Sequence, residues 1–293
     1  MAAQALDTAT AWHLILQAVN RHNATLTTGA DHHRALDIGE NGDWQLRVPA
    51  DSQARQLLKT FLPLCRHLPE SAAPIVVGQM GQSLDGRIAT VTGASKYING
   101  DGGLLHLHRL RAVCDAVIVG AGTASEDNPR LTVRLASGPN PVRVVIDRRR
   151  RVPDTHGIFT DEQSPTLRLV AGRYQPGEKL LPRSGVLDVP CLGDEAKTDP
   201  TEPHRILEVL GDFGLRRLFI EGGGLTVSGF LNAGLLDHLH VMVAPMIIGS
   251  GRPAFSLPEI EKLDNALRPA ANMVDLGSDM LFDLDFSQRP MAD

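Results

Sequence analysis

From residue 74 onward the chain alternates short apolar runs with segments of helical spacing, and this alternation constrains the fold most strongly. Apolar runs separated by amphipathic helices are typical of a parallel sheet that is covered on both faces. The predicted strands are residues 75–80, 116–119, 143–146, 166–170, 218–221, 240–244 and 280–286. The predicted helices are residues 103–113, 124–127, 202–213 and 226–236. We therefore expect an α/β protein.

The first 73 residues form a separate pattern that contains no catalytic motif. The predicted elements are a helix over residues 8–22, strands over 35–38 and 44–48, and a helix that begins at Asp51 or Ser52 and runs to 68. An Asn-Gly pair between the two strands favours a hairpin. We expect a small N-terminal α+β extension of unknown role over residues 1–73 and a second domain over 74–293.

Composition excludes several classes of protein. The 293 residues, 42% of them hydrophobic, suffice for one large or two small domains. A net charge of −5 and the absence of a long basic run argue against nucleic-acid or membrane partners. Three widely separated cysteines predict neither a disulfide scaffold nor a metal site. With no signal peptide and no apolar run of about 20 residues, we expect a cytoplasmic protein.

The segment 218–230 carries the most informative local motif. A short apolar run ends in Glu221, three glycines follow, and a helical pattern begins. Glycines let a ligand approach the backbone closely, and a helix N-terminus attracts anions. This predicts a nucleotide pocket with a substrate-facing Glu221. The alternative is an ordinary strand–turn–helix joint, because the G-x-G-x-x-G spacing is missing.

Four further segments hold polar residues that could contact a ligand. Arg111 and Arg134 are candidates for a phosphate clamp, since guanidinium groups pair with phosphate oxygens in a bidentate way. Arg148 begins a basic run after a predicted strand, where an arginine can accept the 2′-phosphate of NADPH. Ser95 and Tyr97 lie in a Gly-bounded loop. For each of them the alternative is an ordinary solvent-exposed side chain.

Eight short motifs occur in one order along the chain. They are residues 83–86 (SLDG), 93–95 (GAS), 109–111 (RLR), 122–129 (GTASEDNP), 131–134 (LTVR), 145–147 (VID), 221–224 (EGGG) and 244–249 (APMIIG). Together they resemble the reductase domain of the bacterial riboflavin-biosynthesis deaminase/reductase, over residues 74–286. The resemblance implies a dihydrofolate-reductase-like fold with a mixed, mostly parallel sheet flanked by helices. It also implies a homodimer.

The resemblance implies NADPH-dependent reduction of 5-amino-6-(5-phosphoribosylamino)uracil, or its diamino-pyrimidinone analogue, to the ribitylamino form. The residues implied for substrate binding are Ser95, Arg111, Leu131, Arg134 and Glu221. The residues implied for cofactor binding are Gly81, Tyr97, Thr123, Asp127, Arg148, Gly222, Gly223, Gly224, Leu225, Thr226, Val227, Ser228 and Gly229. Asp127 and Glu221 are the candidate catalytic residues, and no metal is implied.

Two features depart from that family. Tyr97 stands where the family usually has tryptophan, which changes the shape of the pocket. Residues 1–73 also lack the H-x-E and P-C-x-x-C ligands of the zinc deaminase domain. One alternative is therefore a paralogous NADPH reductase with another pteridine- or pyrimidine-like substrate, such as dihydrofolate. The other is a non-catalytic binding or regulatory protein.

Overall fold

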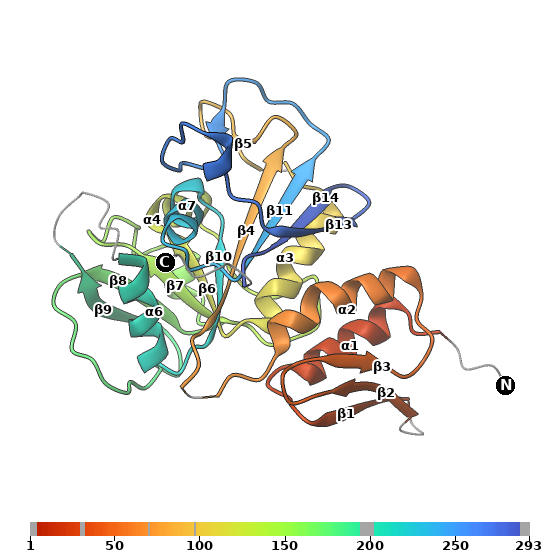
Figure 1. Cartoon of the computed structure of the whole chain (residues 1–293). Coiled ribbons are helices and arrows are strands. Elements are labelled where there is room, and N and C mark those ends of the chain that lie inside the picture. Colours follow the sequence, from red (N-terminus) through yellow and green to blue (C-terminus); the bar gives the residue numbers. More distant parts are fainter. Residues whose placement is uncertain (1–4, 30–32, 70, 97, 194–201, 288–293) are drawn as a thin grey trace. The chain divides into compact units, whose positions relative to one another are not determined.

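The chain divides into two compact units, Met1–Ala73 and Pro74–Asp293. The structure is a computed structural model that describes residues 5–29, 33–69, 71–96, 98–193 and 202–287. Figure 1 traces both units. Within the described residues, no helix combines the length and the apolar character needed to cross a bilayer.

The first unit packs two helices with a small antiparallel sheet (Figure 1). Its elements are α1 (Thr8–Ala18), α2 (Ser52–Cys65), β1 (Ala24–Thr28), β2 (His33–Ile38) and β3 (Trp44–Leu46). The side chain of Asp51 accepts a hydrogen bond from the N–H of Ala54 at 2.6 Å and so caps α2. The rings of Trp12 and Phe61 meet edge to face, 5.4 Å apart, between the helices.

The second unit is built on a nine-stranded sheet in the order β13-β14-β11-β4-β10-β6-β7-β8-β9. The strands are β4 (Ile75–Ser83), β6 (Ala116–Gly120), β7 (Val142–Ile146), β8 (Thr166–Ala171), β9 (Val186–Leu192), β10 (Arg217–Glu221), β11 (His238–Ala244), β13 (Ala270–Asp275) and β14 (Met280–Asp285). All neighbours from β11 to β9 run parallel, whereas β14 and β13 run antiparallel. The predicted mixed, mostly parallel α/β fold is confirmed.

Short helices and a two-stranded ribbon complete this unit. They are α3 (Asp101–Val113), α4 (Ala121–Asp127), α5 (Gly157–Thr160), α6 (Glu202–Asp212), α7 (Gly224–Asn232), the 3-10 helix η1 (Leu263–Asn265), β5 (Arg87–Ala89) and β12 (Arg252–Pro253). The helix predicted over 226–236 begins two residues earlier and ends sooner, because Gly234 adopts a φ of 72°. Such a left-handed residue is typical of a helix C-terminus.

The two faces of the sheet are covered differently. On one face, apolar side chains such as Leu218 and Ile220 of β10 pack with those of α6 and α7, including Val209 and Phe230. On the opposite face, α3 crosses the sheet and contacts β10 and β11 through polar side chains. Both layers bury apolar side chains, since Leu110 of α3 and Phe219 of β10 are also fully buried, but the α3 layer additionally holds a polar network.

The strand order reverses at β10, which lies between β4 and β6. The chain passes from β4 to β6 and outward to β9, then returns to β10 and continues to β11 on the other side. In open α/β sheets, ligands bind at the carboxyl ends of the strands where the order reverses. The segments that follow β6 and β10 therefore frame the candidate site.

Candidate active site

A buried ion pair between α3 and β10 lies at the centre of the site. Nε and Nη2 of Arg111 donate to the two carboxylate oxygens of Glu221 at 2.8 and 2.6 Å. Nη1 of Arg111 donates to the carbonyl oxygen of Thr132 at 2.9 Å. The two charged side chains are only 5% and 13% exposed. Arg111 therefore fixes Glu221 and the loop after α4, and most of its hydrogen-bonding capacity is used within the protein.

The loop after α4 presents Arg134 next to this ion pair. Nη1 of Arg134 donates to the Thr132 hydroxyl at 2.7 Å, and its backbone N–H donates to Nδ1 of His108 at 3.0 Å. Partial burial, followed by the charges of Arg111 and Arg130, lowers the pKa of the Arg134 guanidinium. Three arginines near one point favour an anion, and among the residues that the structure describes only Arg111 has a carboxylate partner there.

His108 supports this loop from α3, and sequence reasoning missed it. Its side chain is buried, and burial, followed by the charges of Arg111 and Arg134, lowers its pKa to about 4. The imidazole is therefore neutral at pH 7, and Nδ1 can accept the hydrogen bond from Arg134. Its position three residues before Arg111 places both side chains on one face of α3 and was the available signal.

The glycine turn after β10 brings α4 and α7 together. Gly222 and Gly223 adopt φ values of 64° and 63°, and Gly223 caps α7 without a side-chain hydrogen bond. A Cβ on Gly223 would lie 2.9 Å from Oγ1 of Thr123, and one on Gly120 would lie 2.7 Å from Oγ1 of Thr226. The first turns of α4 and α7 are thus adjacent, and the N–H groups at the start of α7 point at one region.

The loop that carries Ser95 lies beside the C-terminal end of α4. A Cβ on Gly93 would lie 2.9 Å from Nη2 of Arg252, and Arg252 forms an ion pair with Glu126 at 3.0 Å. Desolvation by the surrounding protein, followed by the charge of Glu126, raises the pKa of the adjacent Asp127, and Lys96 opposes that shift. Ser95 is half-buried in this loop.

Some predicted residues lie away from the glycine turn or are covered by other side chains. Arg148 donates to the Gly193 carbonyl at 2.6 Å and forms an ion pair with Glu202, at the end of β7 rather than β10. A Cβ on Gly81 would lie 1.9 Å from Oδ1 of Asn99, so an asparagine side chain packs against that glycine. Tyr97 lies outside the described residues. The ligand contacts of these residues stay predictions.

The remaining predicted positions differ widely in exposure. Leu131 is 1% exposed and adopts a φ of 53°, in the left-handed region that a leucine rarely adopts. Leu225 is 79% exposed at the start of α7. Val227 and Ser228 are buried, and the Ser228 hydroxyl accepts a hydrogen bond from the N–H of Ser256 at 2.9 Å. A ligand at the glycine turn would therefore meet Leu225 before Val227 or Ser228.

Comparison with known proteins assigns the second unit to a family. Residues 74–281 match the RibD C-terminal domain. The chain belongs to that family. It is 39% identical over 194 residues to the 2,5-diamino-6-ribosylamino-4(3H)-pyrimidinone 5′-phosphate reductase of Methanothermobacter thermautotrophicus, covering 65% of this chain and 86% of that protein. The predicted family resemblance is confirmed.

Longer members of the family match over part of their length. The chain is 35% identical over 198 residues to RibD of Bacillus amyloliquefaciens, covering 67% of this chain and 51% of that protein. Among solved structures, Acinetobacter baumannii RibD superposes with a TM-score of 0.60 at 27% identity, covering 79% of this chain and 62% of that one. The chain thus spans about half of the Bacillus protein.

Proposed function

We propose that the chain reduces 5-amino-6-(5-phosphoribosylamino)uracil, or its diamino-pyrimidinone analogue, with NADPH. The chain is an oxidoreductase of the riboflavin-biosynthesis type, as the names of its relatives indicate. The observation that carries the proposal is the exposed Arg134 beside the Arg111–Glu221 pair, in the unit that also carries the glycine turn after β10. Such a site offers one place for a substrate phosphate and another for the diphosphate of a dinucleotide.

The glycine turn fits a dinucleotide because it offers backbone N–H groups without side chains at its tip. Gly222 and Gly223 carry no Cβ, and the first N–H groups of α7 have no side-chain cap. These groups would hold the diphosphate, and Thr123 borders the same turn. When bound, the nicotinamide supplies the hydride that reduces C1′ of the open-chain substrate. We propose Arg148 as the residue that favours NADPH over NADH.

The chain's own polar groups would orient the substrate. Arg134, held by Thr132 and His108, would bind the phosphate. Glu221, held on both oxygens by Arg111, retains lone pairs that accept hydrogen bonds from substrate N–H or O–H groups. Phosphate binding far from C1′ would align that carbon for reaction. Asp127, whose pKa is raised by desolvation, is our candidate for the proton donor.

NADPH oxidation by the purified chain with the phosphoribosylamino-pyrimidine tests this proposal. We expect Arg134→Ala to raise KM about tenfold or more, because a charge-assisted contact contributes about 1.5–3 kcal/mol. Arg183→Ala is the matched control, since this arginine is also exposed and precedes the edge strand β9, three strands away from β6. NADPH binding without turnover would favour a related reductase with another substrate. Absence of NADPH binding would refute the enzyme proposal.

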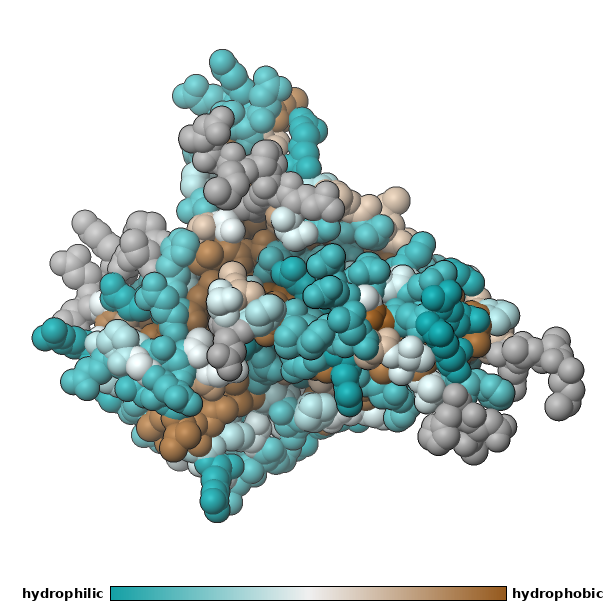
Figure 2. Space-filling model, turned by 60° about the horizontal axis from the view of Figure 1, so that its bottom comes forward, coloured by the Kyte–Doolittle hydropathy of each residue, from teal (hydrophilic) through white to brown (hydrophobic). Residues whose placement is uncertain are grey.

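The oligomeric state and the cellular location are also open to proposal. We propose a homodimer, since large apolar side chains of the second unit are exposed, including Leu84 at 64%, Val91 at 71% and Ile247 at 74%. Figure 2 shows groups of hydrophobic residues, in brown, exposed between the hydrophilic ones, in teal. A light-scattering mass of one chain would contradict the dimer. We propose a cytoplasmic location because all three cysteines are buried thiols and not halves of a disulfide.

A further inference from the structure

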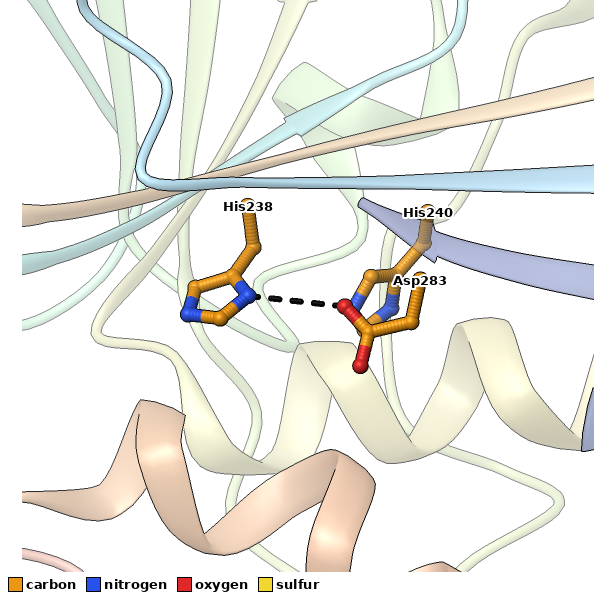
Figure 3. Close-up of side chains that lie close together, drawn as sticks. All are labelled: His238, His240 and Asp283. Atoms are coloured by element: carbon orange, nitrogen blue, oxygen red, sulfur yellow. Dashed lines mark hydrogen bonds and ion pairs between the residues drawn. The ribbon is translucent and has the colours of Figure 1, made fainter. Parts of the chain in front are cut away.

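Three side chains with metal-binding atoms gather on the α3 side of the sheet, in a place that the proposed reaction does not use. His240 of β11 is paired in register with Asp283 of β14, and His238 lies two residues earlier on the same face. Figure 3 shows both imidazoles directed toward the Asp283 carboxylate. One atom from each residue lies within 4.8 Å of the other two, and all three residues are buried.

The separations fit ligands of one metal ion better than hydrogen bonds. Nδ1 of His238 and Nε2 of His240 lie 3.4 and 3.3 Å from Oδ1 of Asp283. Charge-assisted hydrogen bonds to carboxylates are usually about 2.7–2.9 Å long. Ligands about 2.0–2.1 Å from a tetrahedral Zn²⁺ ion are separated by about 3.3–3.4 Å. Within the described residues, the buried Nε2 of His240 has no hydrogen-bond partner.

His106 of α3 contacts the nitrogen of His240 that faces away from Asp283. Its Nε2 lies 2.8 Å from Nδ1 of His240, and both rings are buried. At this distance one of the two imidazole nitrogens donates a hydrogen bond and the other accepts it. When His240 donates from Nδ1, its Nε2 keeps a lone pair that faces the carboxylate. A ligating histidine is typically oriented in this way by a partner on its other nitrogen.

The charges also suit a divalent cation. The Asp283 carboxylate is buried and faces the imidazoles of His238 and His240. The cluster therefore offers one carboxylate and two imidazoles, a donor set that suits zinc. Arg109, whose charge reaches His106, is the cation that opposes binding from α3.

We propose that His238, His240 and Asp283 bind one Zn²⁺-class metal ion that fastens β11 to β14. The sequence predicted no metal, because Asp283 lies on another strand than the two histidines and 43 residues after His240 in the sequence. His240, Gln79 and Glu221 are aligned across β11, β4 and β10. Two strand spacings, about 10 Å, thus separate the backbones of His240 and Glu221. At that separation the ion takes no part in the proposed reaction.

Metal content of the full, untagged chain tests the site without any activity measurement. The protein is stripped with a chelator, equilibrated with Zn²⁺ or Co²⁺, desalted and analysed for metal per chain. We expect one ion per chain and the strong visible absorption of tetrahedral Co²⁺. His238→Gln and Asp283→Asn each should weaken binding at least about tenfold. His204→Gln, which changes an exposed histidine on α6, should bind as the unmodified chain does.

The metal content of the unmodified chain and its variants decides whether the proposed site exists. Equal metal content in the unmodified chain and in both folded site variants would overturn the proposal, as would no metal retention by the unmodified chain. Circular dichroism establishes whether the variants fold. If neither does, the Co²⁺ spectrum of the unmodified chain decides, because an octahedral spectrum contradicts a buried site with two imidazoles and a carboxylate.

Discussion

Replacing Glu221 by glutamine removes the negative charge of a buried ion pair while keeping its shape. Arg111 then keeps a neutral acceptor in place of one carboxylate oxygen, and the new amide NH₂ faces a guanidinium that cannot accept a hydrogen bond. The Thr132 carbonyl still accepts from Nη1 of Arg111 at 2.9 Å. The buried cation therefore loses its counter-ion but not all of its hydrogen bonds.

The magnitude follows from the burial of the pair. Removing one partner of a buried pair costs about 3–5 kcal/mol. The 13% exposure of Glu221 and the remaining acceptors place our expectation at the lower end of that range. We expect the free energy of unfolding to fall by about 3 kcal/mol, or the Tm of the second unit by about 6–12 °C.

The tryptophans provide an internal control for this measurement. Both of them, Trp12 and Trp44, lie in the first unit, so their fluorescence follows that unit, whereas far-UV circular dichroism follows both. In urea, Glu221→Gln should shift the dichroism transition and leave the fluorescence spectrum of the folded chain unchanged. A double variant, Arg111→Met with Glu221→Met, should cost less than the two single changes added together. A shift within about 0.5 kcal/mol for Glu221→Gln, or strict additivity, would refute the reasoning.

Three further changes test other parts of the site. Gly223→Ala should destabilise the chain by about 1–3 kcal/mol and weaken NADPH binding, because its φ is 63° and its Cβ would lie 2.9 Å from Oγ1 of Thr123. Gly229→Ala places its Cβ in open space inside α7 and should stabilise the chain by up to about 1 kcal/mol in the same urea titration. Equal effects of the two substitutions on the free energy of unfolding would contradict this account. The pKa of His108 is about 4 in the folded chain, against an ordinary value of 6.5. Its contribution to the free energy of unfolding is therefore complete above pH 6.5 and is lost as the pH falls toward 4. His108→Asn should make the Tm depend less on pH between these values, and an unchanged profile would argue against burial of this ring. The raised pKa of Asp127 means that stability falls as the pH rises above 3.8, so Asp127→Asn should be at least as stable as the unmodified chain at pH 7. A lower kcat with unchanged Tm for that variant would support its role as proton donor, and an unchanged kcat would remove it.

The sequence predicted the sheet interior well because burial dictates residue type there. Strands such as β6 and β10 are apolar along nearly their whole length. The edge strands β9 and β13, and β1 of the first unit, were missed because many of their side chains are solvated and show no clear period. An edge strand pairs on one side only, so its composition is weakly constrained.

The candidate site was predicted in its parts but not in its pairings. Arg111 and Glu221 were both singled out, yet their ion pair joins residues 110 positions apart and depends on the insertion of β10 beside β6. Strand order is not encoded in local spacing, so the pairing was not visible. His238, His240 and Asp283 were hidden for the same reason, since register between β11 and β14 brings them together.

The insertion of β10 also has a consequence for biosynthesis. On the ribosome, β4 and β6 emerge long before their shared neighbour, and each keeps an unpaired apolar edge until Arg217–Glu221 has left the exit tunnel. Pairing of such distant segments is slow and exposes nascent chains to misassembly. Glu221 and the glycine turn arrive on the same stretch that closes the gap. A nascent chain that ends before β10 would therefore lack both its central strand and its proposed cofactor site.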